Sequence, residues 1–447
     1  MLGEKRIREL TEVILAQSPA DQTEVVIIAE DGALTRFADS TIHQNVSETD
    51  AEVRIRVVLG TRVGVATTNN LDEEALAQAV ETAVGLARVG RENPDFKSLP
   101  GPQALPKVQA FSEATAGCTP EERAKGVGAI CLLARDAGVV ASGALTTAAM
   151  EVAVANSLGI FAHHCTTYAE INTVIMSETS AGYAAALALD VNEVNFGAIG
   201  REALDKCLRS QNPRPLEPGQ YRVILEPYAA QDLIQMLTWT GFGAVAMQEK
   251  RSFMHGRIGE QMMDSCISIW DDGLSPAGIP WPFDFEGVPK QRVDLIKDGI
   301  AKGVVYDSYR AGKEDKASTG HALPAPGPFG PFPLNVFFAP GDSTLEEMIR
   351  STERGLYITR FHYTRPVEPK RVVITGMTRD GTFLIENGEI AYPVKNLRFP
   401  QSYLEALNNV AAIGRDTRLL TGMGSIGRDS VPALMLDGFQ FTGATEF

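Results

Sequence analysis

The sequence is short of the residues that mark secretion and disulfide bonding. Its 447 residues include 5 cysteines, which are scattered without a Cys-x-x-Cys pair. Residues 1–6 lack the apolar segment of a signal peptide. We therefore expect a chain that folds without disulfide bonds in the reducing cytoplasm.

Long hydrophobic runs and an excess of cations are also missing. The most apolar region, residues 139–162, is interrupted by Ser142, Glu151, Asn156 and other polar residues, and falls short of the roughly 18 apolar residues that span a membrane. Lysine and arginine number 41 against 56 aspartates and glutamates, a net charge of −15 that opposes a phosphate backbone. We expect no membrane segment and no nucleic acid partner.

What remains is an ordinary globular composition, 44% hydrophobic and 22% charged, over a length that suits two or three domains. Proline-rich and aperiodic stretches at residues 92–117 and 211–219 are expected to be linkers. They divide the chain into two N-terminal α+β modules, residues 1–100 and 118–211, and a C-terminal unit, residues 219–447.

The first module shows strand and helix patterns in turn. Hydrophobic alternation predicts a strand at residues 24–29 and a hairpin over residues 52–66. A helix from about Leu71 is expected to begin with a capping box between Asn70 and Glu73. This helix would cover one face of a half-buried antiparallel sheet.

The second module starts with a stronger signal. Thr119-Pro120-Glu121-Glu122 combines an N-cap, a proline at the first helical position and a glutamate three residues after the cap. It predicts a helix to about Gly138. Strands at residues 160–167 and 171–175, separated by a turn, and a helix near 201–208 should follow.

The C-terminal unit has short strand patterns at residues 371–375, 382–385 and 390–394 around a loop-rich middle. The fold class that these patterns predict is α+β, with N-terminal mixed α/β modules carrying antiparallel sheets and a C-terminal curved or barrel-like β-rich domain.

Two segments carry a resemblance to a known family. One is Trp281-Pro-Phe-Asp-Phe-Glu-Gly-Val-Pro289, followed by Tyr306-Asp307 and Ser318-Thr319-Gly320-His321. The other is Pro218-Gly-Gln-Tyr-Arg-Val-Ile-Leu-Glu-Pro227. Together they resemble the TldD/PmbA family, whose catalytic members are zinc peptidases with His-Glu-x-x-x-His on a helix. The resemblance covers most of the chain and is strongest over residues 218–394.

The same resemblance implies that the zinc motif is lost here. In an ungapped alignment, Glu226 and Gln231 stand where the two histidines would be, and Gly424 lies in the stretch that corresponds to the metal-binding cysteine. A catalytic zinc needs about three protein ligands and an open water position. The pattern resembles the PmbA or TldE branch, and no cofactor is expected in this chain.

What the family implies is a heterodimer. A TldD-type subunit supplies the zinc and the general base, and the PmbA-type subunit completes a chamber in which unfolded peptides are degraded or trimmed, leader segments included. The alternative is a stand-alone homodimer that binds peptides or acts as a scaffold, or a peptidase with an unrecognised site around His163, His164 or His321.

A separate metal-binding pattern is His163-His164-Cys165. His163 and Cys165 share one face of a strand and His164 lies on the other, so at most two of the three side chains converge. No third ligand is visible nearby. We favour an ordinary strand, with His163 and Cys165 as the first residues to test if metal is found.

The first family-like loop contains two carboxylates, Asp284 and Glu286, which have the chemistry for acid–base work or cation binding. We favour a structural role, in which a short acidic side chain accepts backbone N–H bonds in a tight loop that includes Gly287. The resemblance implies a location at a subunit interface or chamber wall.

The second family-like loop contains Thr319, Gly320 and His321. His321 is the best single candidate for a general base or a substrate contact. No serine or cysteine beside it completes a dyad, so we favour a role in fixing the loop or contacting peptide. The glycines at 422, 424 and 427 match a dinucleotide fingerprint, yet too little sequence follows them for a βαβ unit.

Overall fold

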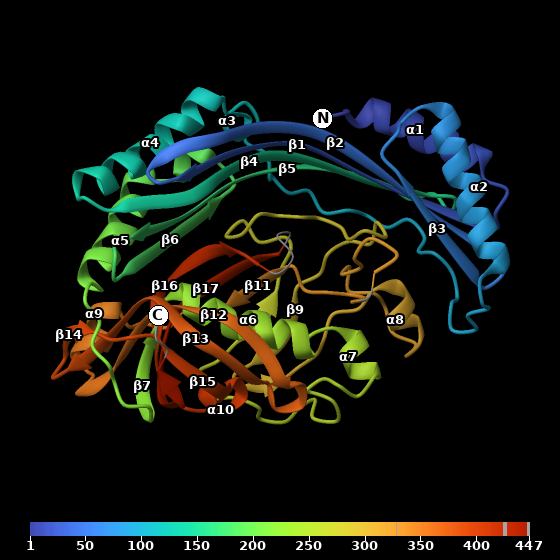
Figure 1. Cartoon of the computed structure of the whole chain (residues 1–447). Helices are drawn as coiled ribbons and strands as arrows, with labels where there is room; N and C mark the ends of the chain where they lie inside the picture. Colours follow the sequence, from blue (N-terminus) through green and yellow to red (C-terminus); the bar gives the residue numbers. More distant parts are fainter. Residues whose placement is uncertain (328, 423–426, 445–447) are drawn as a thin grey trace.

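The computed structural model describes residues 1–327, 329–422 and 427–444. They form two layers, a curved sheet with helices on its outer face and a second α+β unit beneath its inner face (Figure 1). The predicted α+β class is confirmed.

The first sheet is antiparallel throughout. Its six strands run in the order β3 (Arg62–Thr68), β2 (Thr41–Leu59), β1 (Gln22–Ala38), β4 (Val140–Asn156), β5 (Phe161–Met176) and β6 (Ala181–Ala188). Because β1 pairs with β4, strands of both expected N-terminal modules share one continuous sheet. The division into three modules stays a prediction.

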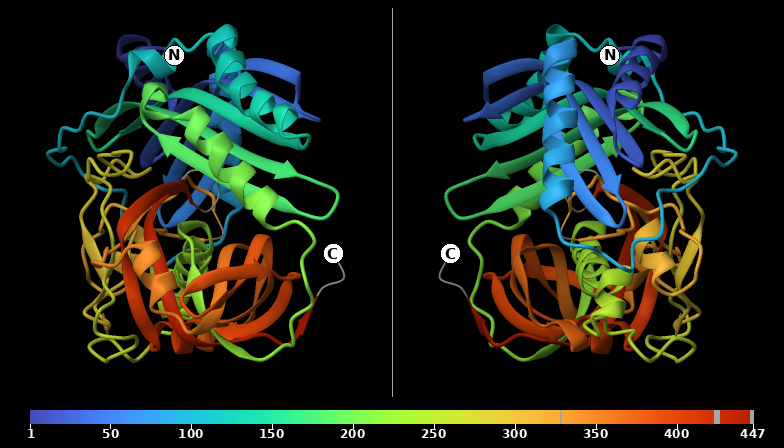
Figure 2. Two further views of the ribbon diagram at one scale, coloured as in Figure 1. Left: turned by 90° about the vertical axis from the view of Figure 1, so that its left-hand side faces the viewer. Right: turned by 90° about the vertical axis from the view of Figure 1, so that its right-hand side faces the viewer.

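Helices cover the outer face of this sheet at both of its ends (Figure 2). They are α1 (Glu4–Gln17) and α2 (Glu73–Val89) at one end, and α4 (Pro120–Asp136) and α5 (Phe196–Arg209) at the other, with the short α3 (Glu113–Ala116) beside them. Alternation decides the packing, since Val25 and Ile27 of β1 join the core beneath α1 and α2 whereas Val26 faces the second layer.

Local signals at helix starts had mixed outcomes. The capping box of α4 is confirmed, because the Thr119 side chain accepts from Glu122 N and the Glu122 side chain accepts from Thr119 N. The capping box at Asn70 is wrong. The N-cap of α2 is Asp72, and the Asn70 side chain accepts instead from Asp72 N in a local turn.

The turn expected between residues 167 and 171 is also wrong, because β5 runs unbroken through it. Tyr168 donates a hydrogen bond to Glu30 across the inner face of the sheet, so a polar stretch continues the strand. In the same way β13 (Val373–Glu386) joins the strands expected at residues 371–375 and 382–385. Pairing with neighbouring strands outweighed the local polarity.

The second sheet has twelve strands and mixed direction, with β7 parallel to β12 and β11 parallel to β17. Its main path runs β10 (Ile300–Ala301), β9 (Val293–Lys297), β8 (Ile269–Asp271), β11 (Asn335–Phe338), β17 (Arg428–Gln440), β7 (Gln220–Leu225), β12 (Arg354–Glu368), β13, β15 (Leu397–Ser402) and β18 (Gly443–Ala444), while β14 (Glu389–Pro393) pairs with β13 and β16 (Val410–Thr421) with β17. The sheet is not a closed barrel, so of the two expected forms the curved one holds.

The main helix of this unit, α6 (Pro227–Gly241), lies against the second sheet, and its buried residues Leu233, Ile234 and Leu237 belong to the largest core cluster. The shorter helices are α7 (Ala244–Gln248), α8 (Ser308–Gly312), α9 (Leu345–Arg350) and α10 (Tyr403–Leu407), with 3-10 turns at Val191–Glu193 and Pro369–Arg371. Within the described residues, no helix has the length and apolar character needed to cross a membrane.

Candidate functional site

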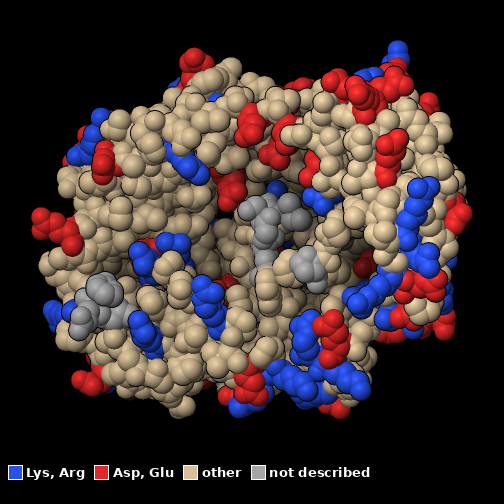
Figure 3. All heavy atoms as spheres, turned by 45° about the vertical axis from the view of Figure 1, so that its right-hand side comes forward, with Lys and Arg blue, Asp and Glu red and all other residues tan. Residues whose placement is uncertain are grey.

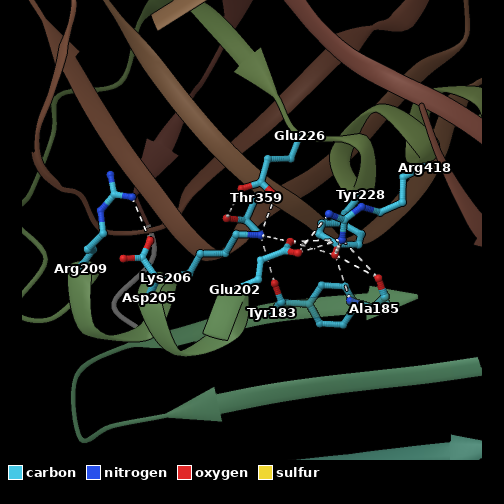
Figure 4. Close-up of polar contacts among 10 residues, drawn as sticks. All are labelled: Tyr183, Ala185, Glu202, Asp205, Lys206, Arg209, Glu226, Tyr228, Thr359 and Arg418. Atoms are coloured by element: carbon cyan, nitrogen blue, oxygen red, sulfur yellow. Dashed lines mark hydrogen bonds and ion pairs between the residues drawn. The ribbon is translucent and has the colours of Figure 1, made fainter. Parts of the chain in front are cut away.

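The candidate site is the junction where β7 enters α6, as the resemblance implied. Glu226 is the N-cap residue, and Pro227 occupies the first helical position, where its fixed φ suits a helix start. The junction faces the β6 end of the first layer and helix α5 (Figure 4). Both layers therefore contribute side chains to it.

Glu226 forms an ion pair with Lys206 instead of offering its carboxylate to a metal. Its Oε2 lies 2.6 Å from Lys206 Nζ of α5, and the Thr359 hydroxyl donates to its Oε1 at 3.3 Å. The Glu226 and Lys206 side chains are only 5% and 9% exposed, so this pair is shielded from water. A buried ammonium beside the carboxylate occupies the space that a cation would need.

The ion pair is part of a larger network, which we call the α6 cluster: Glu202, Lys206, Glu226 and Arg418. Glu202, one turn before Lys206 on α5, accepts from Lys206 Nζ at 2.8 Å and from Arg418 Nη2 of β16 at 3.0 Å. Two carboxylates thus meet two cations (Figure 4). Although burial opposes it, the charges of Lys206 and Arg418 hold the pKa of Glu202 below its usual value.

Tyr228 joins this network to the edge of the first sheet. Its hydroxyl accepts from Ala185 N at 3.0 Å, lies 3.2 Å from Ala185 O, donates to Glu202 at 3.0 Å and contacts Arg418. Burial is the main cause that raises the Tyr228 pKa well above its usual value. The Tyr228 hydroxyl thus contacts the backbone N–H and carbonyl of Ala185 on the edge strand β6. At an uncovered edge, such groups could pair with another strand.

Gln231 points the other way, toward β16 and β17. Its Nε2 donates to Thr421 O at 2.8 Å and to Asp429 Oδ2 at 3.1 Å. Burial raises the pKa of Asp429 to about 6, and the hydrogen bond from Gln231 partly offsets it. Thr421 and Asp429 flank the glycine stretch in which Gly424 was singled out, and Gly424 lies outside the described residues.

The donor chemistry around positions 226 and 231 does not fit a zinc site. A ligand must offer a lone pair, whereas Lys206 offers only N–H groups and Gln231 uses its amide nitrogen as a donor. Among the described residues here, neither a histidine nor a cysteine replaces them.

A cavity of about 180 Å³ lies beside Gln231, between α6, β6 and β12. Its walls include Tyr183 and Ala185 of the first sheet together with Asp232 and Arg360 of the second unit. Burial raises the pKa of Asp232 to about 6, and its oxygens accept from the hydroxyls of Thr364 and Tyr403, both at 2.6 Å. The cavity brings polar groups from both layers to one place.

The first family-like loop is buried against the inner face of the first sheet. Asp284 accepts backbone N–H bonds from Glu286 at 2.9 Å, Val288 at 3.0 Å and Ala322 at 2.9 Å. Burial, with the nearby Glu286 charge, raises its pKa to about 7. Gly287 has φ of +75°, and a Cβ there would lie 2.6 Å from Ile160 Cγ2.

Glu286 connects this loop to the strands above it through what we call the Arg56 cluster: Glu24, Arg56 and Glu286. Arg56 Nη2 lies 2.6 Å from Glu24 Oε2 and 3.0 Å from Glu286 Oε1. Glu286 also accepts from Ser308 N at 2.9 Å. Burial raises the pKa of Glu24 to about 7; the attraction of Arg56 opposes this rise and the Glu286 charge adds to it.

His321 is wholly buried, and both of its ring nitrogens are paired. Nε2 lies 2.8 Å from Asp271 Oδ1 and Nδ1 lies 2.9 Å from the Thr319 hydroxyl. Thr319 also bonds to both the N–H and the carbonyl of Tyr306, while Gly320 has φ of +74°. Burial lowers the His321 pKa. This geometry suits fixing of the loop and leaves no ring nitrogen for substrate.

His163 and Cys165 lie together on the outer face of the first sheet, and His164 lies on the inner face. His164 Nε2 is 3.2 Å from Pro280 O, and its ring packs edge-on against Trp281. Burial lowers the pKa of His164 to about 4 and raises that of Cys165 to about 11. Glu151 of β4, which sequence reasoning missed, accompanies the outer pair.

Sequence reasoning also missed three cations of the site, Lys206, Arg418 and Arg56. The single sequence signal was the i,i+4 spacing of Glu202 and Lys206 on α5, which suggests a local ion pair but does not reveal Glu226. Arg56 and Glu286 lie 230 residues apart.

The fold and this site define an α+β protein in which a strand leads into a helix whose N-cap carboxylate is held in a buried ion pair. A family model described as the PmbA/TldA metallopeptidase C-terminal domain matches residues 218–443, and one described as PmbA/TldA metallopeptidase domain 1 matches residues 23–87. The chain belongs to the PmbA/TldD family.

Relatives from both branches are similar to the chain. Metalloprotease PmbA of Escherichia coli O157:H7 is 25% identical over 430 residues, which cover 91% of this chain and 90% of that protein. A TldD homologue of Haemophilus influenzae is 25% identical, covering 88% and 86%. A metalloprotease of Methanothermobacter thermautotrophicus is 26% identical over about half of each chain, 52% and 51%.

Solved structures share the whole fold. TldE from Thermococcus kodakarensis superposes with a TM-score of 0.89 at 20% identity, covering 98% of this chain and 99% of that one. A putative modulator of DNA gyrase from Thermotoga maritima gives a TM-score of 0.87 at 19% identity, covering 98% and 100%.

Proposed function

We propose that this chain is the non-catalytic, PmbA/TldE-type subunit of a metallopeptidase complex. A TldD-type partner supplies the zinc, and the complex degrades or trims unfolded peptides in the cytoplasm. This chain contributes walls of the chamber and holds no catalytic metal itself.

The observation that carries the proposal is the buried pair between Glu226 and Lys206, 2.6 Å apart at the start of α6. A catalytic zinc needs about three lone-pair donors and a water at this point. Here a carboxylate is already neutralised by an ammonium. A zinc ion here would have to displace the buried Lys206 ammonium from its 2.6 Å contact with Glu226.

The shape of the molecule supports the idea of a chamber wall. Figure 3 shows a hollow between the two layers, with Asp and Glu along its upper rim and Lys and Arg gathered below it. In the proposed role, this space receives an extended peptide and excludes folded domains. The free state of all the described cysteines accords with a reducing compartment.

The test is a reconstitution. The chain, purified without a metal-binding tag, should not cleave an unfolded peptide in a chelator-sensitive way. Adding a TldD-type subunit should give cleavage that a chelator abolishes. A TldD-type subunit whose His-Glu-x-x-x-His glutamate is replaced by glutamine is the control, and it should assemble without cleaving.

Two results would contradict the proposal. Chelator-sensitive cleavage by the pure chain would place the catalytic metal here. A chain that forms only homodimers by light scattering, and does not assemble with the TldD-type subunit, would favour the stand-alone peptide-binding or scaffold protein.

A further inference from the structure

The outer face of the first sheet carries a cluster that the proposed function does not use: Glu151, His163 and Cys165. His163 and Cys165 alternate to the same face of β5, and Glu151 of β4 lies directly opposite Cys165 in the register. The donor atoms of the three side chains all lie within 4.8 Å of one another. The register between β4 and β5 therefore brings three different donor types together on one face of the sheet.

The arrangement of the donors matters more than their closeness. Glu151 Oε1 lies 2.7 Å and Cys165 Sγ lies 3.9 Å from the same ring nitrogen, Nε2 of His163. In a catalytic relay the carboxylate and the nucleophile take opposite nitrogens of the imidazole. Here the three donor atoms gather in one place, and moving the Nε2 proton that bonds to Glu151 over to Nδ1 would free Nε2 to join the other two donors around an ion.

The distances are close to those of a tetrahedral metal site. Zinc bonds of about 2.0 Å to nitrogen and about 2.3 Å to sulfur place neighbouring donors roughly 3.3–3.6 Å apart. The separations of 2.7 and 3.9 Å bracket that range. For these two pairs, side-chain shifts of about half an ångström would reach the tetrahedral separation. The Glu151 and Cys165 donors lie within 4.8 Å of each other.

Glu151 is held in place from behind. Its side chain is 1% exposed. Its Oε2 accepts from Leu2 N at 2.7 Å and from Gly3 N at 3.0 Å, and these hydrogen bonds fix the orientation of the carboxylate. The His163 side chain is 17% exposed, which gives an ion a path from solvent.

We propose that Glu151, His163 and Cys165 bind a zinc ion on the outer face of the first sheet. Imidazole and thiolate ligands favour zinc over magnesium or calcium. The thiol releases its proton on binding, and the doubly charged ion then balances one carboxylate and one thiolate. The site lies across the sheet from the α6 junction, so it does not depend on the proposed peptidase role.

The first experiment is metal binding by the whole chain. Metal-free protein is dialysed against micromolar zinc, and bound zinc is measured by mass spectrometry. We expect about one zinc per chain, and the substitutions C165S, H163Q and E151Q should each raise the zinc Kd at least about 100-fold. Circular dichroism and thermal melting check that each variant folds.

Matched variants identify the site. Cys266 is an exposed free thiol and His255 an exposed histidine, both in the C-terminal unit, so C266S and H255Q should bind zinc like the unchanged chain. Cobalt(II) in place of zinc should show a thiolate-to-cobalt absorption band that C165S abolishes. This band reports the ligand directly, whatever the stability of the variant.

The outcomes separate the two proposals. Binding of less than about a tenth of an ion per chain, or unchanged binding in C165S, overturns the outer site. If Q231A abolishes binding while C165S retains it, the metal lies at α6 and both proposals fail. Loss in C165S with full retention in Q231A supports the outer site and leaves the proposed function standing.

Discussion

Two charge clusters join the first layer to the C-terminal unit, and they differ in how many cations they hold for each carboxylate. In the α6 cluster, the carboxylates of Glu202 and Glu226 meet Lys206 and Arg418. In the Arg56 cluster, Glu24 and Glu286 share a single guanidinium. Both connect the same two layers, yet only the first has a cation for every carboxylate.

The pKa directions follow from that difference. The cations of the α6 cluster lower the pKa of Glu202 against the effect of burial. In the Arg56 cluster burial prevails, raising the pKa of Glu24 to about 7 and that of nearby Asp307 to about 6. At Glu202 the two cations outweigh burial, whereas at Glu24 burial outweighs the single guanidinium that it shares with Glu286.

The largest expected effect is at the balanced cluster. Lys206→Ala leaves Glu226 buried without its cation and should lower the free energy of unfolding by about 3–5 kcal/mol at neutral pH, measured by urea denaturation. The double variant with Glu226→Gln should recover a large part of that loss. Equal stability of the single and double variants would contradict the pairing.

The next test crowds the loop beneath the Arg56 cluster. Gly287→Trp must accommodate a side chain where Cβ would lie 2.6 Å from Ile160 Cγ2, at φ of +75°. Urea denaturation should show a loss of about 3 kcal/mol or more. Gly438→Ala is the matched control because its φ is +70° with nothing within 4 Å of the added Cβ, so it should cost only about 1 kcal/mol. Similar losses in both variants would mean that contact with Ile160 is unimportant.

The pH dependence of the Arg56 cluster gives a smaller effect. The pKa of Glu24 is about 7 in the folded chain against a reference value of 4.5, so between these pH values the folded state keeps a proton that the unfolded state has lost. This contribution to stability is present below pH 4.5 and is lost as the pH rises through 7. Glu24→Gln cannot ionise and should avoid the loss.

Relative to the unchanged chain, Glu24→Gln should therefore gain on the order of 1–3 kcal/mol between about pH 5 and pH 8, measured by urea denaturation at both pH values. Glu202→Gln is the control, because the pKa of Glu202 is lowered and its contribution is lost only as the pH falls below the usual carboxyl range. Its effect should be nearly constant between the two pH values. A pH-independent Glu24→Gln effect would mean that burial does not raise the pKa of Glu24 in the folded chain.

The smallest effect is expected at an exposed pair. Arg222 Nε and Asp437 Oδ1 lie 2.5 Å apart, but their side chains are 32% and 49% exposed. Asp437→Asn should change the free energy of unfolding by less than about 1 kcal/mol, and salt should weaken the difference. A loss as large as that of Lys206→Ala would mean that burial is not what distinguishes the α6 cluster.

Some signals that involve only neighbouring residues predicted local structure correctly. Thr119, Pro120 and Glu122 predicted the start of α4 because the capping box involves only neighbouring residues. The family resemblance, and not a local pattern, singled out the segment ending at Glu226-Pro227, where β7 passes into α6. Local sequence signals gave wrong predictions where pairing with distant strands determined the structure. One case is β5, which continues through Tyr168 although a turn was predicted there.

The candidate site was predicted only in part. Glu226 and Gln231 were identified by position, but their partners Lys206 and Asp429 were not. His163 and Cys165 were placed correctly on one face, whereas Glu151 was invisible because its nearness comes from the register between β4 and β5.

By itself, the sequence determined the family, the α+β class and the missing His-Glu-x-x-x-His motif, because these depend on residue identity and on contacts within a few residues. Only the tertiary structure decided which charges meet. Glu226 pairs with Lys206, which is 20 residues away in the sequence, and Arg56 pairs with Glu286, which is 230 residues away. Ion pairing depends on distance in space and on the exclusion of water, and folding brings about both by packing the two layers together.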